Sequence, residues 1–122
     1  MKANELRIGN YVWDDYSGEM IVSQIMYSTE SVWFRKTWTL PDGHARCSDI
    51  KPIPLTDEWL LKFGFKKEGF SYLHNDLILH VFSNARLVSV PDEDGEWVNI
   101  QPPVQYVHQL QNLYFALTGE EL

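Results

Sequence analysis

The first fifty residues alternate between short apolar runs and turn-forming residues. Runs of this kind lie at 11–13, 20–27, 32–39 and 47–50. The breaks at 14–18 and 41–43 contain Gly, which supplies positive φ, and Asp, which bonds nearby backbone groups. Several short antiparallel strands within so few residues predict a small β-barrel over residues 1–55.

The opening segment LRIGNYV at 6–12 resembles the entry strand of SH3-like barrels, in which a Gly turn precedes a buried aliphatic residue. This resemblance implies that the barrel over residues 1–55 is of the SH3-like type.

Residues 51–56 interrupt this pattern, because they hold prolines at alternate positions, Pro52 and Pro54. Proline fixes its own φ, keeps the preceding residue extended and has no N–H to donate to a sheet. We interpret this segment as the joint between two subdomains that share one core, a barrel over 1–55 and an α+β half over 56–122.

The second half begins with a helix signal. Thr56 is a favoured N-cap, and Asp57 and Glu58 follow in the first turn, where carboxylates meet the positive end of the helix dipole. The pattern predicts a helix over 57–63 that ends at Gly64.

Strand-like runs then return before a final helical pattern. The predicted strands lie at 69–74, 77–83, 86–90 and 97–100, and they form a meander. Helical spacing follows over 104–117. With a barrel in front and the order helix, meander, helix behind it, the chain is predicted to be α+β.

The last helix carries apolar residues on more than one face, at about 100° per residue. One stripe, assigned to the meander sheet, comprises Tyr106, Val107, Leu110, Leu113, Tyr114 and Leu117. A second stripe comprises Val104, His108, Gln111 and Phe115, and the remaining, polar side holds Gln105, Gln109 and Asn112. Apolar residues on the second stripe have no reason to face water. We therefore expect that stripe to pack on the barrel, or on a second copy of the chain.

Composition acts on this picture mainly by exclusion. The chain has 122 residues and is 14% aromatic, which provides ample apolar surface for a globular core. Its apolar runs are far shorter than the roughly 18–20 residues that span a bilayer, and its first residues lack the apolar segment of a signal peptide. The lone cysteine, Cys47, cannot form an internal disulfide and suits a reducing compartment. A cytoplasmic protein is expected.

The net charge of −7 is unevenly distributed. Residues 1–55 carry six basic against seven acidic side chains, whereas residues 56–122 carry four against ten. Binding to phosphate backbones needs clustered cations, so this balance disfavours nucleic acid. An acidic half suits a basic protein partner instead.

Metal and cofactor chemistry finds little support. His44 and Cys47 provide two ligands, whereas zinc sites use three or four. If residues 75–76 form a two-residue turn, His74 pairs with Leu77, and His80 then lies on the opposite face of the sheet. The acidic turn at 92–96 lacks the spaced ligands of a calcium loop. We predict no bound metal and no cofactor.

Catalytic motifs are also missing from the sequence, which has no nucleophile elbow, no P-loop and no dinucleotide fingerprint. An unrecognised pair among the seventeen acidic residues remains as the enzyme alternative.

The strongest surface candidates are aromatic. Strand alternation places Phe34 on one face and Trp33 with Arg35 on the other. Since a small barrel has one filled interior, either Trp33 or Phe34 must face outward. An outward Trp33 beside Arg35 could stack on a base or grip a peptide, and Lys36 with Trp38 would do so if the opposite face is open. The usual burial of large aromatics favours a third arrangement, in which Trp33 packs on the second subdomain.

Three segments resemble a family of small proteins of unknown function from gut Bacteroidales genomes and their prophage or other mobile elements. They are LRIGNYV at 6–12, KPIPLTDEWLLKFGF at 51–65 and YVHQLQNLYFALTGEEL at 106–122. The resemblance covers both ends and the joint, and it implies a bacterial or phage intracellular protein. Because the family has no activity to carry over, it assigns no functional residue.

These observations predict a non-enzymatic protein-interaction module. The resemblance implies that this module is an accessory protein of a phage or mobile element. The alternatives are a single-stranded nucleic-acid-binding module and the enzyme above, and a homodimer is the alternative to a foreign partner. The predicted partner-binding residues are Trp33, Arg35, Trp38, Val104, His108, Gln111 and Phe115. No residue is predicted to be catalytic.

Overall fold

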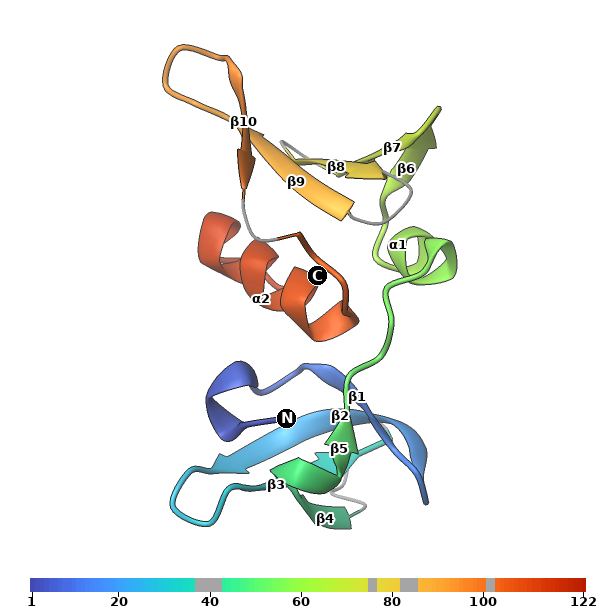
Figure 1. Ribbon diagram of the computed structural model, residues 1–122, viewed down its shortest axis with the longest axis vertical. Coiled ribbons are helices and arrows are strands. Elements are labelled where there is room, and N and C mark those ends of the chain that lie inside the picture. Colours follow the sequence, from blue (N-terminus) through green and yellow to red (C-terminus); the bar gives the residue numbers. More distant parts are fainter. Residues whose placement is uncertain (37–42, 75–76, 82–85, 101–102) are drawn as a thin grey trace. The chain divides into compact units, whose positions relative to one another are not determined.

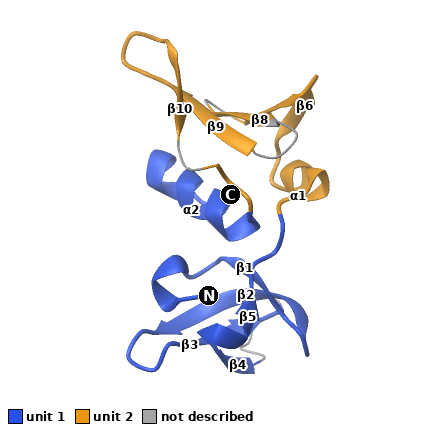
Figure 2. Ribbon diagram, in the orientation of Figure 1, with its two compact units in different colours: residues 1–54, 106–122 blue, residues 55–105 orange. Residues whose placement is uncertain are grey.

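The computed structural model describes residues 1–36, 43–74, 77–81, 86–100 and 103–122, and it is a mixed α+β protein built on antiparallel sheets (Figure 1). The chain divides into two compact units (Figure 2). Unit 1 comprises residues 1–54 and 106–122, and unit 2 comprises residues 55–105. The C-terminal helix therefore belongs with the first sheet, whereas the sequence analysis placed it in the second half.

Unit 1 is built on a curled antiparallel sheet whose described strands run in the order β4-β3-β2-β1-β5. The strands are β1 (Tyr11–Asp14), β2 (Gly18–Met26), β3 (Ser31–Arg35), β4 (Gly43–Arg46) and β5 (Ile50–Lys51). The 3-10 turns η1 (Ala3–Glu5) and η2 (Cys47–Asp49) and the helix α2 (Val107–Thr118) complete the unit.

The core of unit 1 forms where one face of each strand meets the two 3-10 turns. Its buried members are Ala3, Leu6, Val12, Met20, Val22, Val32, Phe34, Cys47 and Ile50. The prediction of a strand over 47–50 is wrong for most of its length, because residues 47–49 form the 3-10 turn η2. The first N–H of this turn, that of Cys47, donates to the Glu30 carbonyl at 2.8 Å.

Helix α2 begins at Val107, three residues later than the pattern predicted. Tyr106 is the N-cap, with extended backbone, and its N–H donates to the Gln109 side-chain oxygen at 3.1 Å. The helix ends at Thr118, and Gly119 is its C-cap, with a φ of 75° that glycine adopts without strain. Val104 therefore lies outside the helix.

Unit 2 contains one short helix and a second antiparallel sheet. Helix α1 (Asp57–Lys62) starts as predicted, with Thr56 Oγ1 accepting from the Trp59 N–H at 3.4 Å. The described strands are β6 (Lys66–Glu68), β7 (Ser71–His74), β8 (Leu77–Val81), β9 (Arg86–Pro91) and β10 (Trp97–Ile100). They follow the order β10-β9-β8-β7-β6.

The pairing of β7 with β8 confirms the predicted hairpin register. His74 pairs with Leu77 and Ser71 pairs with His80, so the two imidazoles lie on opposite faces. The turn residues 75–76 themselves lie outside the described residues. Among the described helices, none has the length and apolar character that crossing a membrane requires.

Candidate interaction surfaces

The free edge of β10, residues 97–100, is the first candidate surface. In the described part of unit 2, β10 pairs with β9 on one side and with no strand on the other. The strand carries no charge, and the side chains of Trp97 and Val98 are 52% and 47% exposed. Exposed, uncharged edge strands are templates for pairing with another chain, because their outer N–H and C=O groups lack partners.

The turn before β10 determines which of its backbone groups face outward. The Asp92 N–H donates to the Glu96 carbonyl at 2.7 Å, and the Gly95 N–H donates to the Asp92 carbonyl at 3.0 Å. Gly95 has φ of 81°, so this is a three-residue hairpin loop with a glycine in the left-handed conformation. Asp92 and Glu96 are consequently a hydrogen-bonded pair at the end of the ladder.

Hydrogen-bonded and non-hydrogen-bonded pairs alternate along an antiparallel ladder. In the observed register Val98 opposes Val90, two positions from the turn pair, so these two residues exchange bonds. Trp97 and Asn99 oppose Pro91 and Ser89 at the intervening positions. The backbone N–H and C=O groups of Trp97 and Asn99 therefore point away from β9, toward the free edge of β10.

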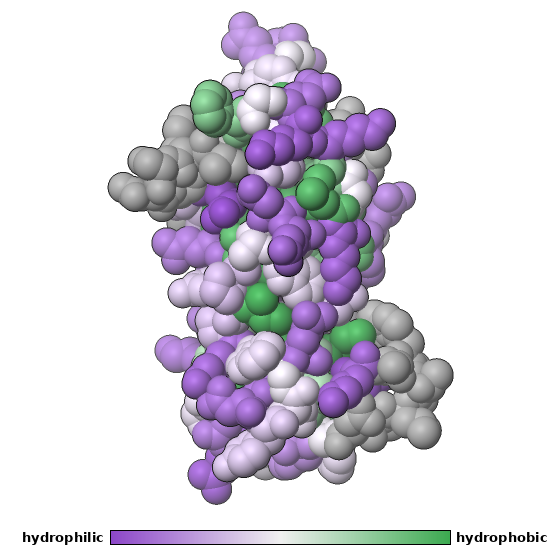
Figure 3. All heavy atoms as spheres, turned by 90° about the vertical axis from the view of Figure 1, so that its right-hand side faces the viewer, coloured by the Kyte–Doolittle hydropathy of each residue, from purple (hydrophilic) through white to green (hydrophobic). Residues whose placement is uncertain are grey.

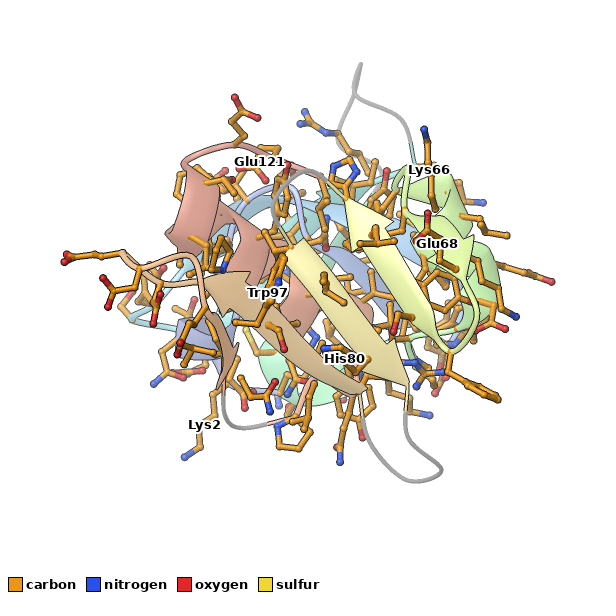
Figure 4. The ribbon with its side chains drawn as sticks, turned by 90° about the horizontal axis from the view of Figure 1, so that it is seen from above. Lys2, Lys66, Glu68, His80, Trp97 and Glu121 are labelled. Atoms are coloured by element: carbon orange, nitrogen blue, oxygen red, sulfur yellow. The ribbon has the colours of Figure 1, made fainter. Side chains whose placement is uncertain are left out.

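The other edge of the same sheet is different in kind. Strand β6 consists of Lys66, Lys67 and Glu68, all exposed and all charged, a composition that discourages pairing with another chain. Lys66 and Glu68 share one face of the sheet with His80 and Trp97 (Figure 4). Charge thus protects one edge of this sheet and leaves β10 unprotected.

The outward face of β3 is the second candidate surface. Phe34 is 3% exposed in the core and Trp33 is 39% exposed, so Trp33 is the residue that faces outward. The Trp33 ring lies beside the ring of His44 on β4, with centroids 4.9 Å apart. Arg35, two residues after Trp33, lies on the same face of β3. Of the other predicted residues here, Lys36 is exposed, and Trp38 lies outside the described residues.

The second stripe of α2 contacts the sheet of its own unit. Gln111 is 2% exposed, and its side-chain oxygen accepts from the Tyr11 N–H at 2.9 Å. Its amide nitrogen donates to the Gly9 carbonyl at 3.1 Å. The Arg7 guanidinium lies 3.7 Å from the centre of the Phe115 ring. Gln111 and Phe115 therefore contact β1 and the residues just before it within the same unit.

His108 and Val104 differ from the other members of that predicted stripe. His108 is 5% exposed, and burial lowers the pKa of its imidazole, with the Glu5 carboxylate opposing this in part. Val104 lies in unit 2, where its N–H donates to the Arg86 carbonyl at 2.8 Å. The prediction that Val104 shares a helix face with His108 is therefore wrong, because the chain is still extended at residue 104.

Two amides that the sequence analysis did not select complete this helix contact. Asn10 is 1% exposed, and its side chain donates to the Asn112 side-chain oxygen at 2.8 Å. The Asn112 amide in turn donates to the Glu5 carbonyl at 3.0 Å. The available signal was a pair of adjacent amides, Gln111 and Asn112, within an otherwise largely apolar helix.

The cleft at one end of the unit 1 sheet, about 640 Å³ in volume, contains acidic residues. Asp14 accepts from the Ser17 N–H at 3.1 Å, and exposed Asp15 forms an ion pair with Lys51 at 2.9 Å. The hydrogen bond from Lys51 lowers the pKa of Asp15, the opposite of what a catalytic proton donor needs. Within the described residues, no three His, Cys, Asp or Glu side chains are grouped so that they could hold a metal ion.

The one cysteine is a core residue. Cys47 is 1% exposed, and burial raises the pKa of its thiol, with the Glu30 carboxylate adding to the effect. Reactive cysteines have a lowered pKa and an accessible sulfur. Cys47 therefore serves packing.

The face shown in Figure 3 is largely hydrophilic, and its apolar side chains appear as small separate patches. Comparison with protein-family models, curated proteins and solved structures finds no match to this chain.

Proposed function

We propose that the protein is a non-enzymatic protein-interaction module that binds an extended segment of its partner along the free edge of β10. In this mode, main-chain hydrogen bonds provide affinity and alternate side chains provide specificity. The observation that carries the proposal is the outward direction of the Trp97 and Asn99 backbone groups on an exposed, uncharged strand.

The finer description of the fold belongs to the same proposal. We take the curled sheet of unit 1 to be an SH3-like barrel and the sheet of unit 2 to be a meander that ends at β10. The resemblance of the three segments to proteins of Bacteroidales mobile elements supports a role as an accessory protein in a bacterial cytoplasm.

A proline substitution at Asn99 tests strand addition directly. Asn99→Pro removes an outward N–H but no ladder bond to β9, because Asn99 and Ser89 are a non-hydrogen-bonded pair. The probe is a fluorescein-labelled heptapeptide of alternating valine and threonine with a terminal lysine, followed by fluorescence anisotropy. We expect Asn99→Pro to weaken peptide binding about tenfold or more, equivalent to about 1.4 kcal/mol.

Asn99→Ala is the matched control, since it removes the same side chain and keeps the backbone N–H. This variant should bind the peptide within about twofold of the unaltered protein, a difference of less than about 0.5 kcal/mol. Thermal unfolding of both variants checks that the fold is intact. Equal binding by Asn99→Pro and Asn99→Ala would show that the edge N–H does not contribute, and the proposal would fail.

Single-stranded nucleic acid is the second candidate ligand, and the exposure of Trp33 beside His44 and Arg35 favours it. Stacking of a base on an aromatic side chain contributes about 1–3 kcal/mol. We expect Trp33→Ala to weaken binding of a labelled oligonucleotide at low salt by about 5- to 150-fold. Trp97→Ala is the control, because Trp97 is an exposed tryptophan on the other unit, and it should leave oligonucleotide binding unchanged. Binding that is insensitive to salt, or equal losses in both variants, would exclude this surface.

A further inference from the structure

We propose that the segment added to β10 is the β10 strand of a second copy of this chain, paired antiparallel about a two-fold axis at Val98. The inference rests on the proposed function, because it identifies the partner of the same edge. Symmetric dimers of this kind need a surface that complements itself. The backbone of β10 meets that condition.

The spacing of the outward residues determines the register. Trp97 and Asn99 are two positions apart, with inward-bonded Val98 between them. Pairing centred on Val98 places Trp97 of each copy opposite Asn99 of the other. Each of these pairs exchanges two N–H···O bonds, so every outward donor and acceptor of both residues finds a partner.

The side chains agree with this register. The two Val98 residues would oppose each other as a non-hydrogen-bonded pair, with Cα atoms about 4.5 Å apart. On the other face the two Trp97 residues would be diagonal neighbours, about 7–8 Å apart and within reach for aromatic contact. Pairing thereby covers the two most exposed apolar side chains of the strand.

Charge selects the antiparallel arrangement and this edge. The turn before β10 carries four carboxylates, Asp92, Glu93, Asp94 and Glu96. Antiparallel pairing places the turns of the two copies at opposite ends of the joined strands, whereas parallel pairing would place all eight carboxylates together. Pairing of β10 with the charged β6 strand of a second copy would leave one free edge on each copy. Further copies could then add head to tail, so the assembly would not close.

A cysteine at Val98 tests both the partner and the register. At the two-fold position the Cβ atoms of opposed residues approach to about 4.5–5.5 Å, close to the separation that a disulfide requires. Under mild oxidation we expect the Val98→Cys variant to convert almost completely to a covalent dimer. Asn99→Cys is the matched control, because residue 99 opposes residue 97 in this register, and it should cross-link much more slowly. The unaltered protein, whose Cys47 is buried, should not cross-link.

Light scattering provides the second measurement. The unaltered protein is expected to shift from the mass of one chain toward twice that mass as its concentration rises, and Asn99→Pro is expected to remain a monomer. A monomer at all concentrations that still binds the valine-threonine peptide would overturn the second-copy inference and leave the proposed function standing. A monomer that binds no peptide would remove both.

Two other outcomes also contradict the inference. A dimer that persists in Asn99→Pro, together with slow Val98→Cys cross-linking, would place self-association on another surface. Masses that rise beyond two chains would indicate head-to-tail pairing.

Discussion

Replacing Phe34 with alanine is expected to lower the free energy of unfolding by about 3–5 kcal/mol. Replacing the adjacent Trp33, which is the larger residue, is expected to cost only about 1 kcal/mol. The reason is their exposure, 3% for Phe34 and 39% for Trp33. The Phe34 ring is also closely surrounded, since a Cβ added at Gly43 would lie 2.8 Å from it. Urea unfolding followed by circular dichroism measures both changes.

The control for residue type is Phe70→Ala. Phe70 is 87% exposed, so the loss of its ring should change the free energy of unfolding by less than about 0.5 kcal/mol. If Trp33→Ala proved as costly as Phe34→Ala, Trp33 would be a core residue, and its candidacy as a binding surface would end.

Replacing Gln111 with leucine is expected to lower the free energy of unfolding by about 2–4 kcal/mol. The substitution keeps the approximate size of the side chain but leaves the Tyr11 N–H and the Gly9 carbonyl without their partner. Each buried group left unsatisfied costs about 1–3 kcal/mol. Urea unfolding curves of the variant and of the unaltered protein measure this decrease in the free energy of unfolding.

Gln24→Leu is the matched control, because Gln24 is an exposed glutamine on β2 of the same unit. A change of less than about 0.5 kcal/mol is expected there. A Gln111→Leu protein as stable as the unaltered one would mean that the amide does not hold α2 on its sheet.

Local sequence signals predicted the parts of the fold that depend on neighbouring residues. The N-cap at Thr56 and the left-handed Gly64, with φ of 92°, set the limits of α1 within one residue. The hairpin of β7 and β8 followed from apolar alternation on either side of a short turn. These features need no knowledge of the rest of the chain.

Features for which an element's own residues carry no signal were missed or misplaced. Lys66, Lys67 and Glu68 have no apolar alternation, and they form β6 only because β7 provides a ladder. The attachment of α2 to unit 1 rests on side-chain bonds to Gly9, Asn10 and Tyr11, about a hundred residues away.

The candidate site follows the same division. Alternation showed that one of Trp33 and Phe34 faces outward, but only the position of the core decides which. The apolar strand at 97–100 was predicted in full. The free edge of this strand was not predicted, because the order of strands in a sheet depends on which strands pair, and the residues of one strand do not determine that.

The bridge between Pro54 and Tyr106 makes unit 2 an insertion within unit 1. The Val107 N–H donates to the Ile53 carbonyl at 2.9 Å, and the Leu55 N–H donates to the Gln105 carbonyl at 3.0 Å, so the outgoing and returning segments lie side by side. During synthesis on the ribosome, all of unit 2 leaves the exit tunnel before the helix that completes unit 1. The side-chain N–H groups of Asn10, which donate to the side-chain oxygens of Gln111 and Asn112, therefore gain these partners only when residues 101 and 102 positions later have been made. The inserted unit is free to fold first, so the order of folding along this chain need not follow the order of its residues.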